Sequence, residues 1–158
     1  MSTWVTTTEW TATRKRCCVQ AIREFARALP QLPEAEFSPP GRGAIILNIE
    51  GVAVSVYPLV LSRRAVRGRI REGAMLAVFQ KNEPVGDRAG VAIAEILHRA
   101  LQQTGLENLH PAECLVADVF RRKVFSAKPQ NQRVLSNITS ACREIAVRWP
   151  ALRAVFAA

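Results

Sequence analysis

The stretch that decides the fold is residues 74–120, AMLAVFQKNEPVGDRAGVAIAEILHRALQQTGLENLHPAECLVADVF. It begins with an apolar run at 74–79, which is apolar on both faces, as a central strand is. The apolar pattern then predicts a helix over 87–104, with Gly105 as its stop. A second apolar run, at 114–120, predicts another strand. If these two strands are parallel neighbours, the connection between them is right-handed, and the centre of the chain is a strand–helix–strand unit.

The residues before this unit predict a helix and a β-hairpin. The helix is expected from about Thr6, where Thr-Thr-Thr-Glu has the form of a capping box, to Pro30, which cannot continue it. Residues 30–43 are rich in Pro and Gly and are expected to be a connector. An apolar run at 44–47 and an alternating run at 52–57 are separated by turn residues and predict a hairpin. The first helix carries one apolar stripe, made of Cys18, Ile22, Phe25 and Leu29.

The residues after the unit predict a short strand and a long helix. Val124 and Phe125 are expected in the strand, Pro129 suits the first turn of the helix, and Pro150 is expected to end it. This helix has the cleanest apolar pattern in the chain, with Val134, Leu135, Ile138, Ala141, Cys142, Ile145, Ala146 and Trp149 recurring at helical spacing.

Together these elements predict one domain over residues 1–158, of class α+β (α/β). The expected order is α-β-β-β-α-β-β-α, with helices covering a mixed sheet of about four or five strands. A length of 158 residues and a hydrophobic content of 49% suit a single globular domain. The sequence contains no apolar run long enough to cross a membrane, and residues 1–10 are polar. We therefore expect a cytoplasmic protein with no membrane partner.

The charge of the chain points to a polyanionic partner. Lys and Arg number 22 against 13 Asp and Glu, which gives a formal net charge of +9. Arginines cluster in residues 62–72, interpreted as a loop between two strands, with Gly68 giving it room to flex. If the backbone is extended there, Arg67, Arg69 and Arg71 project from one face and can follow a phosphate backbone. A solvated surface loop is the alternative interpretation of the same stretch.

The first functional hypothesis is therefore a non-catalytic nucleic-acid-binding domain, with DNA or RNA as the partner. No aromatic residue interrupts residues 59–72, so base stacking on this stretch is disfavoured. The residues expected to contact phosphates are Arg63, Arg64, Arg67, Arg69, Arg71, Arg121, Arg122 and Lys123.

The second hypothesis is a subunit of a larger assembly. Both terminal segments carry large apolar residues, namely Trp4 and Trp10 near the start and Leu152 and Phe156 near the end. Such segments dock on a protein partner, on a second copy of the chain, or on the body of the same domain.

Asp118 is the most unusual carboxylate because it interrupts an apolar strand. A buried carboxylate is unfavourable unless it is paired or hydrogen-bonded. One interpretation is a catalytic or ligand-binding acid. The other is a residue at the end of the strand that pairs with Arg121, Arg122 or Lys123.

The order of a helix, three strands, a helix and a strand is similar to the core of the restriction-endonuclease-like nucleases. That resemblance implies an Asp, followed by a Glu/Asp-x-Lys pair on the adjacent strand, holding a metal ion. The chain contains no Glu-x-Lys or Asp-x-Lys, and the apolar run at 74–79 has no charge. We therefore expect no metal, no cofactor and no metal-dependent hydrolase activity. A degenerate or active nuclease of this class remains the second alternative.

Histidine and cysteine supply no recognisable catalytic motif. All four cysteines lie in apolar patterns, which favours small buried hydrophobes, and no zinc-type spacing is present; they are Cys17, Cys18, Cys114 and Cys142. His98 and His110 have no Ser, Cys or Asp partner at a known spacing, so a Cys–His nucleophilic pair would require a tertiary contact.

Overall fold

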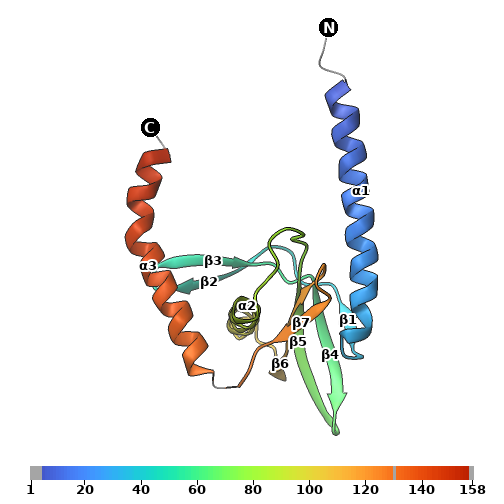
Figure 1. Ribbon diagram of the computed structural model, residues 1–158. Helices are drawn as coiled ribbons and strands as arrows, with labels where there is room; N and C mark the ends of the chain where they lie inside the picture. Colours follow the sequence, from blue (N-terminus) through green and yellow to red (C-terminus); the bar gives the residue numbers. More distant parts are fainter. Residues whose placement is uncertain (1–4, 130, 157–158) are drawn as a thin grey trace.

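The computed structural model describes residues 5–129 and 131–156, with side chains for residues 11–129 and 131–153. The fold is α+β, as predicted, with three helices, a mixed five-stranded sheet and a separate two-stranded sheet (Figure 1). The helices are α1 (Val5–Ala28), α2 (Asp87–Leu101) and α3 (Gln132–Phe156). A single 3-10 turn, η1 (Leu29–Gln31), follows α1.

The main sheet has the strand order β1-β4-β5-β6-β7. Only β5 and β6 run parallel, and α2 connects them, so the predicted strand–helix–strand unit is confirmed. The other neighbouring pairs are antiparallel. The strands are β1 (Glu36–Ser38), β4 (Val60–Val66), β5 (Arg69–Val78), β6 (Leu109–Asp118) and β7 (Lys123–Ser126).

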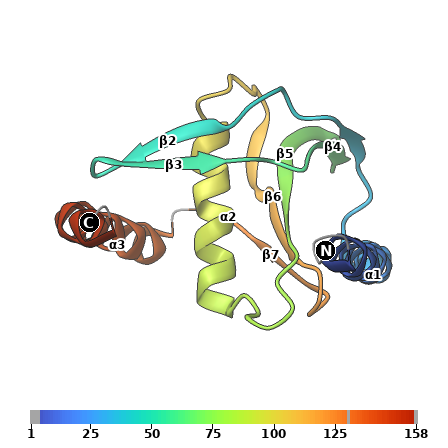
Figure 2. The same cartoon turned by 90° about the horizontal axis from the view of Figure 1, so that it is seen from above.

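The predicted first hairpin is also present, as β2 (Ile45–Ile49) and β3 (Val52–Val56). Its turn places Glu50 and Gly51 at positive φ, and the side chain of Asn48 accepts a hydrogen bond of 3.1 Å from the Gly51 N–H. This hairpin is not part of the main sheet. It crosses over α2 and reaches the middle of α3, where Glu50 pairs with Arg143 (Figure 2).

The predicted element order is wrong in one respect, because five strands precede α2 instead of three. One addition is β1, a short exposed strand inside the Pro-rich connector. The other is β4, which contains the first part of the arginine stretch, while the second part forms a turn and the start of β5. Charged side chains hide the alternation of a strand when both of its faces are partly exposed, so composition alone indicated a loop.

Each face of the sheet has its own core. On one face α2 packs its predicted inner residues, Ala94, Leu97 and Leu101, which are buried together with Cys114 and Val116 of β6. On the other face Met75 and Leu115 pack against the end of α1 and the segment after it. The two helices that flank the sheet therefore lie on opposite sides of it (Figure 2).

Helices α1 and α3 extend beyond the body of the domain on the same side (Figure 1). Their apolar stripes are only partly covered: Ile22 of α1 and Ile145 of α3 are exposed. Pro150 does not end α3, which continues to Phe156. The prediction that Pro150 stops the helix is therefore wrong, because the proline interrupts the hydrogen-bond ladder without breaking the helix. Within the described residues, no helix has the length and apolarity needed to span a bilayer.

Candidate nucleic-acid interface

The arginine stretch is a β-hairpin, not the loop that its composition suggested. Strands β4 and β5 pair from Val60↔Met75 to Val66↔Arg69. Two residues form the turn: Arg67 with φ 51° and Gly68 with φ 74°. Positive φ at both central residues is the signature of the hairpin turn whose twist matches that of the strands. Gly68 therefore makes a tight turn possible and does not loosen a loop.

The tip of this hairpin carries the free positive charge of the region. The side chains of Arg63, Arg67 and Arg69 are exposed and form no ion pair with any residue that the structure describes. Arg71 is half-buried and shares one face of β5 with Arg69. The expected row of three arginines is thus only partly formed, because Arg67 lies in the turn and not on the strand. We call Arg63, Arg67 and Arg69 the hairpin tip.

Arg64 has a different environment from the hairpin tip. Its Nε and one terminal nitrogen donate hydrogen bonds of 2.7 and 2.8 Å to the two carboxylate oxygens of Glu113 on β6. Glu113 is 1% exposed, and its hydrogen bonds raise the pKa of Arg64. A guanidinium held by both carboxylate oxygens is not available to a phosphate. Arg64 is therefore tied to β6 and does not share the free charge of the hairpin tip.

The second predicted basic group lies at the opposite end of the sheet. Arg121, Arg122 and Lys123 follow the C-terminal end of β6, whereas the hairpin tip lies at the N-terminal end of β5. Because β5 and β6 are parallel and β5 has 10 residues, roughly 30 Å of strand separates the two groups. The structure does not bring them together.

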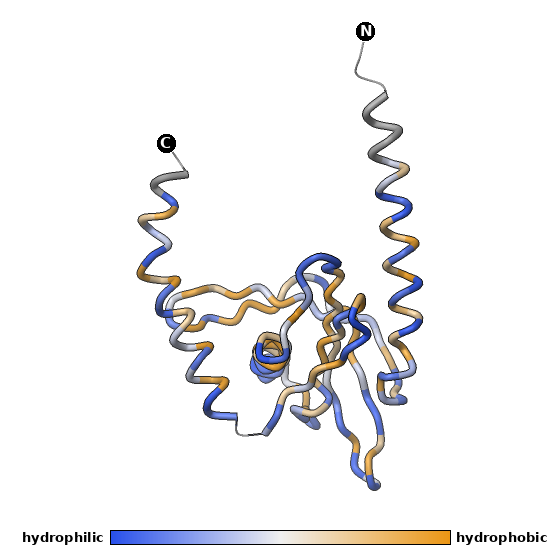
Figure 3. Tube along the Cα trace, viewed as in Figure 1, coloured by the Kyte–Doolittle hydropathy of each residue, from blue (hydrophilic) through white to orange (hydrophobic). Residues whose placement is uncertain are grey.

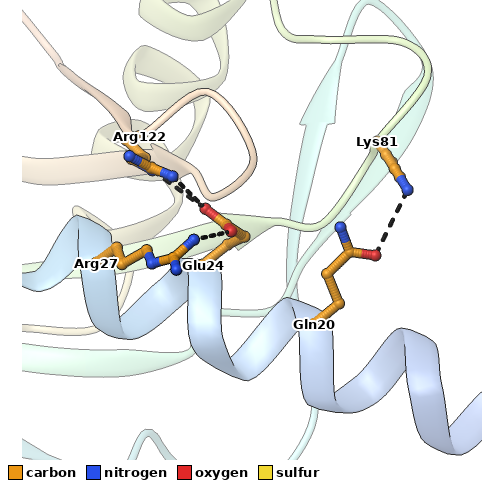
Figure 4. Close-up of polar contacts among 5 residues, drawn as sticks. All are labelled: Gln20, Glu24, Arg27, Lys81 and Arg122. Carbon is orange, nitrogen blue, oxygen red and sulfur yellow. Dashed lines mark hydrogen bonds and ion pairs between the residues drawn. The ribbon is translucent and has the colours of Figure 1, made fainter.

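Two members of this second group have acidic partners. Arg122 donates hydrogen bonds of 2.9 and 3.1 Å to Glu24 of α1, and this contact lowers the pKa of Glu24 (Figure 4). Lys123 pairs with Asp87 at the start of α2 and lies over the ring of Phe125. These contacts attach α1 and α2 to the β6–β7 turn. The side chain of Arg121 is exposed.

Asp118 is 1% exposed and acts as an acceptor for the backbone. One carboxylate oxygen accepts a hydrogen bond of 2.9 Å from the Val85 N–H, and the other accepts one of 3.2 Å from the Arg121 N–H. The sequence suggested a pairing with the side chain of Arg121, Arg122 or Lys123. The structure instead shows that the partners are backbone N–H groups, one of them in the loop before α2. Asp118 thus holds two loops at one end of the sheet.

The sequence did not single out the buried glutamates. Glu113 is almost fully buried beside Cys114, and Glu95 is buried on α2. The Oε1 atom of Glu95 lies 3.9 Å from Nδ1 of His98 and from Nε of Arg99, and its Oε2 has no hydrogen-bond partner among the described residues. For Glu95 the available signal was a glutamate flanked by apolar residues within a predicted helix, whereas Glu113 lies just before the run at 114–120 that predicted the strand.

His110 and Cys114 lie together without forming a nucleophilic pair. The His110 carbonyl oxygen, not its ring, accepts the Cys114 thiol at 3.7 Å. Burial raises the pKa of Cys114 to about 12, so the thiol stays protonated. The ring Nδ1 of His110 accepts a hydrogen bond of 3.2 Å from the Ala112 N–H. Cys114 and Cys142 are buried, as predicted, whereas Cys17 and Cys18 are exposed.

The carboxylates that a metal-dependent nuclease would need are dispersed. Glu50 pairs with Arg143 of α3, and Glu72 accepts the Asn108 N–H, so neither lies with Asp118. Among the residues whose side chains the structure describes, no group of three or more His, Cys, Asp or Glu residues is placed to hold a metal ion.

Comparison with known protein families, curated proteins and solved structures found no match to this chain. Its function is therefore inferred from its own residues and their geometry.

Proposed function

We propose that this chain is a non-catalytic nucleic-acid-binding domain that contacts phosphates through the hairpin tip. The observation that carries the proposal is the exposed charge at the end of a projecting hairpin, where Arg63, Arg67 and Arg69 lie together without an acidic partner among the described residues and Arg67 has a φ of 51° (Figure 1). A left-handed backbone costs a non-glycine residue about 1–2 kcal/mol, and Asn, Asp or Gly is favoured at this turn position. A long, positively charged side chain at this position disfavours formation of the turn, but it is well placed to bind a phosphate.

The surroundings of Arg67 support the same function. Arg63 and Arg69 are exposed beside it, and the chain carries a net charge of +9 that attracts polyanions. Strands β4 and β5 contain no aromatic residue on which bases could stack. We therefore expect binding to the phosphate backbone of DNA or RNA with little sequence preference.

The proposed interface is smaller than the one expected from the sequence. It contains the hairpin tip, with Arg71 at its edge. Arg64 is engaged by Glu113, and the group at the β6–β7 turn lies at the far end of the sheet.

The test compares two triple variants that remove the same charge. One changes Arg63, Arg67 and Arg69 to Gln, and the other changes three exposed arginines elsewhere, Arg23, Arg88 and Arg133, to Gln. Fluorescence anisotropy with labelled DNA and RNA oligonucleotides is measured at two salt concentrations. The hairpin variant should bind at least about tenfold more weakly and lose about 0.9 in the salt slope for each duplex phosphate contact removed. Equal weakening by the two variants would show that only bulk charge matters.

A second candidate function is a subunit of a protein assembly. The supporting observation is that α1 and α3 project from the domain and carry exposed apolar residues, including Ile22 and Ile145 (Figure 1). Isolated helices are marginally stable in water, so a projecting helix benefits from a partner. Of the terminal residues that suggested this function, Trp4, Trp10 and Phe156 lie outside the described side chains, and Leu152 is exposed. Light scattering by the whole chain tests for self-association.

We place either function in the cytoplasm. The free, exposed thiols of Cys17 and Cys18 suit a reducing compartment. Fractionation of the native host, with antibodies against the chain, tests this location.

A further inference from the structure

Helix α3 carries an apolar seam that continues beyond the part of the helix that packs against the domain. Ile138 and Cys142 are buried against the core. The same spacing of three and four residues continues to Ile145, Trp149 and Leu152, which are 47%, 57% and 48% exposed. Alternating spacings of three and four place all five residues on one side of the helix, as in a coiled coil. We call Ile145, Trp149 and Leu152 the distal seam. Helix α3 meets the β2–β3 hairpin near Arg143, which pairs with Glu50, and continues beyond the hairpin (Figure 3).

The domain itself does not cover the distal seam. Every residue from 147 to 153 is exposed. Pro150 lies inside this part of the helix, where the missing N–H and the ring carry a cost in helix stability. Packing of the distal seam against a partner would offset this cost, in the way that Ile138 and Cys142 stabilise the first half of the helix.

The charges beside the distal seam indicate the chemistry of the partner. In the heptad set by the seam, Arg148 and Arg153 occupy the two flanking positions that face a partner helix. Arg148 is paired only within α3, to Glu144 at 2.9 Å, and both side chains of this pair are mostly exposed. Arg153 forms no ion pair with any described residue. The flanks of the seam are therefore basic on both sides.

This charge pattern argues against a second copy of the chain. In a parallel pair of α3 helices, Arg148 of one copy would face Arg153 of the other, and like charges at these positions are destabilising. An antiparallel pair places arginines opposite each other as well. Two chains with a net charge of +9 each would also repel one another.

We infer that the distal seam binds an amphipathic helix of another protein, with apolar residues at the seam and Asp or Glu at the flanking positions. This partner covers Ile145, Trp149 and Leu152 and pairs with Arg148 and Arg153. The inference rests on the second candidate function, the assembly subunit, and is independent of the hairpin tip.

The probe is a labelled peptide of four heptads with Leu at the two seam positions and Glu at the two flanking positions. Mutual repulsion of the Glu residues keeps the peptide from pairing with itself. A matched peptide carries Lys in place of Glu. By fluorescence anisotropy the whole chain should bind the Glu peptide at least about tenfold more tightly than the Lys peptide.

Three variants separate the seam from bulk attraction. Ile145→Ser and Trp149→Ser should each weaken binding of the Glu peptide by about fivefold or more, since each loses a buried apolar contact. Val147→Ser removes an equally apolar residue on the opposite side of the helix, 76% exposed, and should leave binding unchanged. A double variant should bind the Lys peptide more tightly than the Glu peptide; it combines Arg148→Glu and Arg153→Glu. Identical melting curves by circular dichroism verify that these surface variants fold.

Four results would overturn the inference, each in a different way. Equal affinity for the two peptides would be consistent with an assembly role but would exclude a preference for a partner helix with acidic flanking residues. A wild-type dimer in sedimentation velocity that dissociates with Ile145→Ser would identify a second copy as the occupant. Displacement of the peptide by an oligonucleotide, still seen after the hairpin tip is changed to Gln, would assign α3 to nucleic acid. A monomer that binds neither peptide would remove α3 from the assembly hypothesis altogether.

Discussion

Arg64 of β4 and Glu113 of β6 bind each other across the strand between them, β5, through hydrogen bonds of 2.7 and 2.8 Å. Gly73 of β5 makes this approach possible, because a Cβ atom there would overlap the carbonyl group of Glu113. The ladder between β5 and β6 is irregular at this point. The ion pair thus ties three strands together.

The two partners of this ion pair should not be equally important for stability. Arg64→Ala leaves the Glu113 carboxylate buried without a charged partner and should cost about 3–5 kcal/mol. Glu113→Ala leaves Arg64, whose side chain is 30% exposed and can turn into water, so the loss should be smaller, about 1–3 kcal/mol. Urea unfolding of each variant measures the difference. A larger loss from Glu113→Ala would mean that packing, not charge, dominates at this site.

Arg67→Asn should separate folding from binding. Asn accepts positive φ at this turn position better than Arg does, so the free energy of unfolding should stay the same or rise by up to about 1 kcal/mol. Affinity for DNA or RNA should fall, because one phosphate contact is lost. Denaturation and anisotropy on the same preparation measure both quantities. Loss of stability together with affinity would assign Arg67 a structural role in place of a binding one.

The parts of the fold that could be predicted are those in which burial leaves a local pattern. The strands on either side of α2 are apolar runs, and Ala94, Leu97 and Leu101 recur at helical spacing. Turn residues between two alternating runs likewise indicated the β2–β3 hairpin. In these elements each residue's environment is set by its neighbours in the chain.

The features that could not be predicted depend on distant partners. Glu113 meets Arg64 across 49 residues of chain, and Asp118 meets Val85 across 33. No local pattern encodes such pairs. The exposed seam of α3 could not be predicted for another reason. An apolar stripe such as the one that includes Ile145 predicts that the helix face is covered, but not whether the same domain or another protein covers it.

Asp118→Ala should destabilise the protein without revealing a catalytic role. The substitution removes the acceptor for the N–H groups of Val85 and Arg121, both in part-buried or buried contacts. Two hydrogen bonds to a carboxylate predict a loss of about 2–4 kcal/mol, and Asp118→Asn, which keeps one oxygen, should lose less. Thermal and urea unfolding give these values. Cleavage of DNA or RNA by the wild type with Mg²⁺ or Mn²⁺, abolished in a folded Asp118→Asn protein, would refute the structural role.

We expect the free energy of unfolding to fall in mild acid because of His110. Burial is the main cause that lowers the pKa of His110 below 6.5, and the positive charges of Arg71, His98 and Arg64 add to it, while Glu113 opposes it. The folded state therefore prefers the neutral ring, whose Nδ1 accepts the Ala112 N–H at 3.2 Å. The unfolded chain binds the proton more readily, so this stability is complete above pH 6.5 and is lost as the pH falls through the folded pKa.

His110→Asn, which keeps an acceptor near Nδ1 but does not titrate, should flatten this part of the stability profile, whereas His98→Gln should retain it. Urea unfolding between pH 7.5 and pH 5 provides the measurement, and identical profiles for wild type and His110→Asn would show that another group is responsible.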